Sequence, residues 1–131
     1  MDTGPLVALL DPRDEWHQRV LAAWPELVDR CLTTEAVLTE STYLVGRGSA
    51  GAVTALEYVL AAEIPVVPLP VAALRQVALL MRQYGDVPMD FADATLVTVG
   101  DALGVSRVFT TDRRGFAAYR ASRGVAFRLL P

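Results

Sequence analysis

The stretch DFADATLVTVGDALGVSRVFTTD, residues 90–112, contains one complete helical pattern and one complete strand pattern. Asp90 is placed to cap a helix over residues 91–103, which a glycine ends. Residues 105–111 then predict a strand, and Asp112 directly follows it. A helix that leads into a short buried strand is typical of a parallel sheet covered by helices.

The same alternation of helices and short apolar strands extends over the rest of the chain. We expect further helices near residues 5–10, 14–24, 34–46, 49–60, 70–84 and 113–120, and further strands near 31–33, 64–69 and 125–129. No Asn-Gly or Asp-Gly pair marks a hairpin between strands, and no linker or repeat divides the sequence. The pattern predicts a single α/β domain over residues 1–131.

Composition places the chain among folded proteins. Hydrophobic residues make up 53% of the 131 residues, which excludes intrinsic disorder. The longest apolar runs are interrupted by prolines such as Pro68 and Pro70, well short of the roughly 20 residues of a spanning helix. The chain does not open like a signal peptide, and Cys31 is its only cysteine. We therefore expect a cytoplasmic protein with no membrane association and no internal disulfide.

The residues that are missing limit the chemistry. All twelve basic residues are arginine, asparagine is absent, and His17 is the only histidine. A P-loop, a Schiff base, a multi-histidine metal site and a ribonuclease histidine pair are therefore excluded. If the protein is an enzyme, its carboxylates must do most of the work. The net charge of −3 is unusual for a nucleic-acid protein, but metal binding to several carboxylates would offset it.

Four acidic residues fall where a parallel sheet would bring them together. Asp2 and Asp112 lie at strand ends, Asp93 lies in the first turn of its helix, and Glu40 lies in the helix after another strand. Several ionised carboxylates need a counter-charge, and Mg²⁺ prefers such oxygen ligands. Each acid also has a purely structural interpretation. Asp90 is first a helix cap and only second an auxiliary ligand.

Four blocks of this sequence resemble the motifs of PIN-domain nucleases in order, spacing and surrounding residues. The blocks are Asp2–Leu10, Thr34–Glu40, Asp90–Val97 and Val108–Phe116. Together they extend over essentially the whole chain. The resemblance implies a three-layer α/β/α sandwich with a central parallel sheet.

The resemblance also implies an activity and a site. A Mg²⁺-dependent endoribonuclease, with Mn²⁺ as a substitute, would use Asp2, Glu40, Asp93 and Asp112 as catalytic and metal-binding acids. Water would attack the phosphorus in line and leave a 5′-phosphate and a 3′-hydroxyl. By the same resemblance, Thr3 and Thr110 would be hydroxyl neighbours of the site and Asp90 an extra acid. Arg113 and Arg114 are candidates for contacts with the RNA backbone.

Among PIN proteins, the chain is similar in size to the VapC-type toxins of bacterial toxin–antitoxin pairs. That similarity implies a homodimer that cleaves RNA and is blocked by a small antitoxin protein. A second hypothesis is a PIN fold that binds RNA or a partner without cleaving. A haloacid dehalogenase-type phosphatase and a receiver-like domain are disfavoured, because both need a lysine.

The beginning of the sequence departs from the family pattern. PIN proteins have several strand residues before the first acid, whereas here only Met1 precedes Asp2. Either a natural start lies upstream, or the first strand is shortened and holds Asp2 poorly. The second alternative predicts weakened metal binding rather than a different fold.

Overall fold

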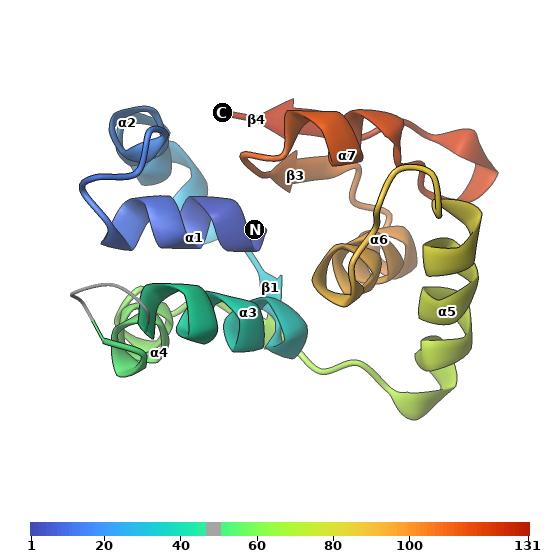
Figure 1. Ribbon diagram of the computed structural model, residues 1–131, viewed down its shortest axis with the longest axis horizontal. Helices are drawn as coiled ribbons and strands as arrows, with labels where there is room; N and C mark the ends of the chain where they lie inside the picture. The colour runs from blue at the N-terminus through green and yellow to red at the C-terminus, as the bar shows by residue number, and fades with distance from the viewer. Residues whose placement is uncertain (47–50) are drawn as a thin grey trace.

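Helices and short strands alternate along the chain in the computed structural model, which describes residues 1–46 and 51–131 (Figure 1). The α-helices are α1 (Thr3–Leu10), α2 (His17–Leu27), α3 (Glu35–Gly46), α4 (Val53–Ala61), α5 (Leu74–Gln83), α6 (Phe91–Leu103) and α7 (Arg113–Ala118). The strands are β1 (Thr33–Thr34), β2 (Val66–Val67), β3 (Arg107–Phe109) and β4 (Arg128–Leu130). Single 3₁₀ turns are η1 (Val28–Arg30), η2 (Val71–Ala73) and η3 (Ser122–Gly124).

The described strands form two parallel pairs. β1 pairs with β2, and β3 pairs with β4. The first two residues of the chain lie between these pairs and hydrogen-bond to both. The Met1 nitrogen donates to the Leu32 carbonyl at 2.6 Å, and the Asp2 amide donates to the Phe109 carbonyl at 2.9 Å. The spatial order is therefore β2, β1, Met1–Asp2, β3, β4.

Two hydrophobic cores lie on opposite faces of this arrangement. One contains side chains of α1, α2 and α4 with Phe109, whose ring stacks on Trp24 at a centroid distance of 6.1 Å. The other contains side chains of α5, α6 and α7 with Val108. Neighbouring strand residues point to opposite faces, so one strand serves both cores. Figure 1 shows α1, α2 and α4 on one side and α5 to α7 on the other. The expected α/β/α sandwich is confirmed.

The helix that opened the sequence argument has the expected ends. The Asp90 carboxylate accepts from the Asp93 amide at 2.8 Å and so caps α6. Gly104 closes the helix with a φ of 66°, a conformation that side chains other than glycine rarely adopt. The short helix α1 also agrees with expectation, and it ends at Leu10 before Asp11.

The second helix differs from expectation at both ends. α2 begins at His17 rather than after Asp14, whose carboxylate caps a turn through the Trp16 amide. The sequence pattern ends this helix near residue 24 and predicts a connection over residues 25–30, which is wrong, because α2 continues through Pro25 to Leu27. Proline leaves the carbonyl four residues earlier, that of Leu21, without its helical donor. Both residues are exposed, so water can replace that bond.

The strands are shorter than the segments that predicted them. The run 64–69 yields only Val66–Val67, because Pro65 and Pro68 on either side have no amide proton to donate to a ladder. The strands expected over 31–33, 105–111 and 125–129 reduce or shift to β1, β3 and β4.

Two helices of the middle of the chain differ in detail. The helix expected from Pro70 begins as the turn η2 and becomes α5 at Leu74. The sequence pattern indicates one apolar face on α4 with Val53, Leu56, Val59 and Leu60, but of these only Val59 is buried, together with the smaller Ala55. Ser49, which is a cap candidate for this helix by its residue type, lies outside the described residues. No helix in the described ranges combines the length and the apolar character needed to cross a membrane.

Candidate active site

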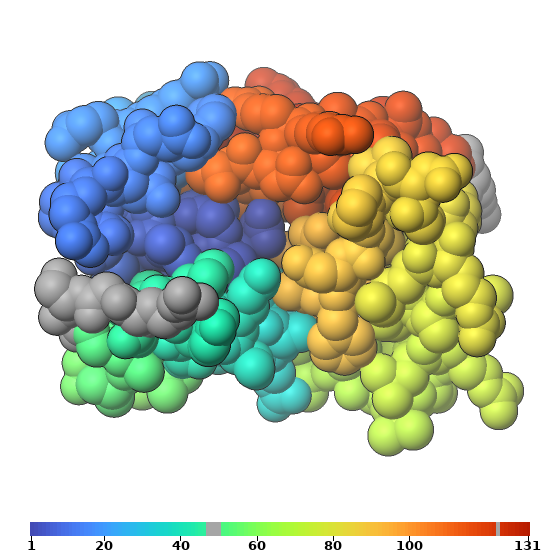
Figure 2. Space-filling view, viewed as in Figure 1, coloured from blue at the N-terminus to red at the C-terminus, as the bar shows by residue number. Residues whose placement is uncertain are grey.

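The four candidate acids line a single cleft of about 300 Å³. Asp2 and Thr3 enter it from the start of α1, Glu40 from α3, Asp93 from the first turn of α6, and Asp112 from the cap of α7, three residues after β3. Figure 2 shows the surface hollowed where these dark blue, teal, tan and orange segments meet. The topology therefore gathers residues that are up to 110 positions apart in the sequence into one site.

Asp2 is the most firmly held of these acids. One carboxylate oxygen accepts from the Thr3 amide at 2.6 Å, and the other accepts from the Thr110 hydroxyl at 2.7 Å. Its backbone amide is bonded to Phe109. Of the two alternatives for the beginning of the sequence, the poorly held Asp2 does not agree with these hydrogen bonds. Burial raises the pKa of Asp2 to about 6, although its bonds to Thr110 and Thr3 oppose that shift.

The Asp93 carboxyl is influenced by the charges of three other acids, Asp2, Asp90 and Asp112. Burial raises the pKa of its carboxyl to about 8, and the charges of Asp2 and Asp90 add to the shift. The Tyr119 hydroxyl, 3.2 Å from Asp93 Oδ2, acts in the opposite direction. A second carboxylate beside a buried one is unfavourable without a cation, so the cleft favours a bound positive charge.

Thr110 connects two of the acids. Its hydroxyl donates to Asp2 and accepts from the amide of Asp112 at 2.9 Å. Asp112 in turn caps α7, because its Oδ1 accepts from the amides of Arg114 and Gly115 at 3.0 and 2.9 Å. Two strand-end acids are thus positioned through one buried hydroxyl.

Thr3 performs a similar role on the other side of the cleft. Its hydroxyl donates to Glu40 Oε2 at 2.7 Å. The contact joins the first turn of α1 to the middle of α3. Both hydroxyls singled out in the sequence therefore bond to a candidate acid.

Two glycines permit the close approach of these segments. A methyl group on Gly4 would overlap the Thr111 side chain, and one on Gly115 would overlap both the Asp112 carboxylate and the Tyr119 hydroxyl. Any larger residue at either position must push a wall of the cleft outward.

Sequence reasoning missed one residue that lines the cleft and one that supports it from behind Asp93. Asp14 lines the cleft, whereas its place before a helical pattern indicates only a helix cap. Tyr119 touches Asp93 and lies 2.9 Å from the Pro88 carbonyl. It is fully buried, and burial followed by the Asp93 charge raises its pKa. No local pattern could reveal this contact, because it joins residues 26 positions apart.

The two candidate RNA-binding arginines differ in their surroundings. Arg113 lies over the Trp16 ring, 5.6 Å from its centroid, and donates to the Pro131 carbonyl. Arg114 is exposed, and its backbone amide donates to Asp112 Oδ1 at 3.0 Å. The structure therefore leaves Arg114 better placed than Arg113 to reach a phosphate.

The donor set of the cleft fits a hard divalent cation. Its ionisable side chains are carboxylates, which are the oxygen ligands that Mg²⁺ prefers. Within residues 1–46 and 51–131, no three acidic, histidine or cysteine side chains are already grouped as metal ligands. Mg²⁺ usually keeps several of its waters and takes one or two carboxylates directly, so a spread-out set of acids still suits it.

Comparison with known proteins identifies the family. The PIN domain model matches residues 1–121. The chain belongs to the PIN domain family. This PIN domain is 26% identical over 133 residues to Ribonuclease VapC26 of Mycobacterium tuberculosis, a match that covers all of this chain and 98% of the relative.

The solved structures place the PIN domain in the same fold. It matches the crystal structure of VapC20 of Mycobacterium tuberculosis, described as a Sarcin-Ricin loop cleaving toxin, with a TM-score of 0.76 and 23% identity. The match covers 85% of this chain and 88% of that one. At this identity the likeness establishes the fold alone.

Proposed function

We propose that this PIN domain is a divalent-metal-dependent endoribonuclease that hydrolyses RNA phosphodiester bonds. The observation that carries the proposal is the convergence of Asp2, Glu40, Asp93 and Asp112 on one cleft. The similarity to a protein named as a ribonuclease, over the whole chain, supports it.

In this proposal, the acids and hydroxyls of the cleft have separate roles. Asp2, Asp93 and Asp112, with Glu40, would hold Mg²⁺ or Mn²⁺, directly or through water. When bound, such an ion polarises a phosphoryl oxygen, favours ionisation of water and stabilises the leaving oxygen. Thr110 keeps Asp2 oriented toward the cleft through its 2.7 Å bond.

Two hydroxyl groups, those of Tyr119 and Thr3, would position Asp93 and Glu40 by hydrogen bonds. Tyr119 donates toward Asp93 and favours its ionised form, which is the form that binds a cation. Thr3 fixes Glu40 Oε2. Fixed ligands reduce the reorganisation needed when substrate arrives, which is the main protein contribution to phosphoryl chemistry.

We propose Arg114 as the first contact with the RNA backbone. It is exposed beside the cleft, and an arginine can bind a phosphate with two parallel hydrogen bonds. Arg113 would act mainly by fixing the wall that carries Arg114, because it already contacts Trp16 and Pro131.

The biological setting we propose is a toxin–antitoxin pair. VapC26 and VapC20 carry names of the VapC type, and VapC20 is described as a toxin that cleaves the sarcin–ricin loop. A structured ribosomal RNA loop is therefore the first substrate to try. A small antitoxin protein that blocks the cleft and a homodimeric toxin belong to the same proposal.

The test is a cleavage assay on a labelled sarcin–ricin loop RNA and on total ribosomal RNA. Cleavage should require Mg²⁺ or Mn²⁺, stop with EDTA and leave 5′-phosphate ends. Asp93→Asn should reduce cleavage by at least about a thousandfold. The matched control Asp86→Asn, at an exposed loop acid, should be fully active. Full activity of Asp93→Asn would refute the assignment.

The second candidate, a PIN fold that only binds RNA or a partner, predicts a different result. RNA would be retained by the wild type with no cleavage at any metal concentration. The packing of four oriented acids around one cleft favours the enzyme over this alternative, because a pure RNA-binding surface gains nothing from buried carboxylates.

A further inference from the structure

The acid cleft also has an apolar wall. Among the described residues that line it, Val7 and Leu44 are the two whose side chains are purely hydrocarbon. Leu44 is 41% exposed and Val7 is partly exposed, so solvent reaches both side chains. A single exposed leucine is common on protein surfaces. Two apolar side chains from different helices, beside a set of carboxylates, form a surface that neither a metal ion nor a phosphate needs.

The two apolar side chains occupy equivalent positions on neighbouring helices. On α1, Val7 follows Thr3 by four residues and shares its helix face. On α3, Leu44 follows Glu40 by the same interval. The two helices lie side by side and run in the same direction (Figure 1), and the hydrogen bond from Thr3 to Glu40 joins them at the level of the acids. Val7 and Leu44 therefore lie together one turn farther along, about 6 Å from that level.

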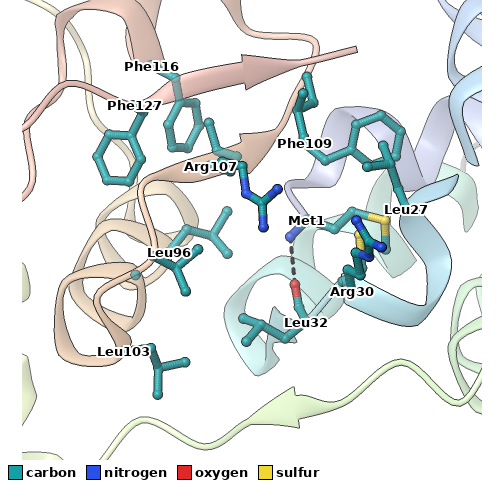
Figure 3. Close-up of a pocket in the computed structure, with 15 residues that line it drawn as sticks. Met1, Leu27, Arg30, Leu32, Leu96, Leu103, Arg107, Phe109, Phe116 and Phe127 are labelled. Atoms are coloured by element: carbon teal, nitrogen blue, oxygen red, sulfur yellow. Dashed lines mark hydrogen bonds between the residues drawn. The ribbon is translucent and has the colours of Figure 1, made fainter.

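The other apolar cavity of the described residues has a different lining. It has a volume of about 170 Å³, lies next to Met1 and contains side chains such as Leu96 and Phe109 (Figure 3). Its charged lining residues in the part of the chain that the structure describes are Arg30 and Arg107, and no carboxylate lines it there. It has no ligand for a metal ion beside its apolar surface. The wall of Val7 and Leu44 combines both, because it shares its cleft with the acids.

The position and the chemistry of this wall suit a nucleobase. In a nucleotide chain, each base is one sugar away from a phosphate, a separation similar to one helical turn. A phosphate bound at the acids through a cation would therefore place the base of an adjacent nucleotide near Val7 and Leu44. The two faces of a base are flat and largely apolar, so contact with aliphatic side chains removes them from water without any hydrogen bond.

The charge of the cleft supports the same assignment. Its described lining contains six carboxylates, and no arginine: the acids are Asp2, Asp14, Glu40, Asp90, Asp93 and Asp112. Within this lining, a bound cation is what attracts an RNA backbone. A contact between the apolar wall and a base adds affinity that does not depend on charge.

The wall also determines which bases it accepts. The side chains of Val7 and Leu44 have no donor or acceptor, so they cannot distinguish bases by their hydrogen-bonding edges. The strength of the contact depends on the area buried, and a purine has a larger face than a pyrimidine. A base that is paired and stacked within a duplex cannot offer its face to a side chain.

We propose that Val7 and Leu44 form a subsite for one unpaired nucleobase next to the scissile phosphate, with a preference for purines. The subsite rests on the proposed ribonuclease function, because it takes a base from the same RNA whose phosphate is bound at the acids. It makes the enzyme select unpaired nucleotides by the area of the base rather than by a sequence.

The test is the binding of three fluorescein-labelled RNA nonamers, measured by anisotropy. One contains only adenosine, one contains only uridine, and one has the same phosphate backbone with abasic riboses. Ca²⁺ is present, because it takes oxygen ligands as Mg²⁺ does. The wild type should bind the adenosine nonamer more tightly than the uridine nonamer, and about tenfold more tightly than the abasic nonamer.

The variants separate the base from the backbone. Leu44→Ala should weaken binding of the adenosine nonamer about fivefold and leave binding of the abasic nonamer unchanged. Leu44→Met keeps most of the hydrocarbon surface and should bind both nonamers as the wild type does. The matched control Leu79→Ala, at an exposed leucine of α5, should also bind both as the wild type does.

Three results would overturn the proposal. Leu44→Ala weakens the adenosine and abasic nonamers equally, or it binds the adenosine nonamer as tightly as the wild type. In the third, the wild type binds all three nonamers alike or binds none, which would leave the wall for a protein side chain. The proposed function is tested separately. A base-dependent effect of Leu44 in a protein that does not cleave RNA would keep the subsite and refute the nuclease, whereas cleavage without that effect would do the reverse.

Discussion

Replacing Asp93 with asparagine should make the metal-free protein more stable while it removes activity. The carboxyl is buried beside Asp2 and Asp90, and its pKa is raised to about 8 in the folded protein. Its ordinary pKa is 3.8. The folded state therefore holds a proton that the unfolded state releases between these pH values. Stability is highest at low pH and falls as pH rises toward 8.

The size of the effect follows from this window. Each pH unit inside it costs at most about 1.4 kcal/mol, which gives an upper limit of about 6 kcal/mol at pH 8. The cleft opens to solvent, and local relaxation reduces the cost of the charge. We therefore expect Asp93→Asn to gain about 2 kcal/mol at pH 8 in EDTA. An amide oxygen can still accept from Tyr119, so the neutral side chain fits the same place.

The assay is urea unfolding at pH 5 and pH 8, in EDTA and in Mg²⁺. In EDTA, the wild type should lose stability between pH 5 and pH 8, and Asp93→Asn should lose much less. Mg²⁺ should stabilise the wild type more than the variant. The exposed control Asp86→Asn should follow the wild type. An Asp93→Asn protein that is no more stable than wild type at pH 8 in EDTA would refute the electrostatic argument.

Three further changes test individual contacts of the cleft. Arg114→Ala should raise KM for RNA several-fold and lower the slope of binding affinity against salt by about one phosphate contact. The control Arg82→Ala, on the exposed end of α5, should change neither value. An unchanged salt slope in Arg114→Ala would contradict the proposed phosphate contact. Gly115→Ala should lower kcat at least about tenfold, because the added methyl group displaces the Asp112 carboxylate that caps α7. Gly85→Ala, where the methyl group makes only ordinary contacts, should leave kcat unchanged. Equal effects of the two substitutions would contradict a role for the close approach at Gly115. Tyr119→Phe should move the acid limb of the pH–rate profile to higher pH, because removing its hydrogen bond raises the pKa of Asp93. An acid limb at the same pH would mean that the Tyr119 hydroxyl does not influence the ionisation of Asp93.

Much of the fold could be predicted because its signals are local. Asp90 and Gly104 mark the two ends of α6 by capping chemistry that acts within a few residues. Strand lengths could not be predicted as well, because a ladder depends on its partner. β2 contains only Val66 and Val67, because these are the residues that pair with the two residues of β1, although the apolar run around them is longer.

The candidate site shows the same division. The strand-end acids Asp2 and Asp112 could be placed together from topology alone. The contact of Tyr119 with Asp93 could not, because it depends on how the chain after α7 packs against α6. Likewise, the sequence left open how well Asp2 is held, because its bond to the Thr110 hydroxyl joins residues 108 positions apart.

The most direct test of a divalent-metal site at this cleft is a crystal grown with Mn²⁺ and measured for anomalous scattering. We predict a strong anomalous peak in the cleft, in contact with Asp93 and with at least one of Asp2, Glu40 and Asp112, directly or through one water. The same peak should be absent in Asp93→Asn. An empty cleft at saturating Mn²⁺, in a protein that cleaves RNA, would contradict the account.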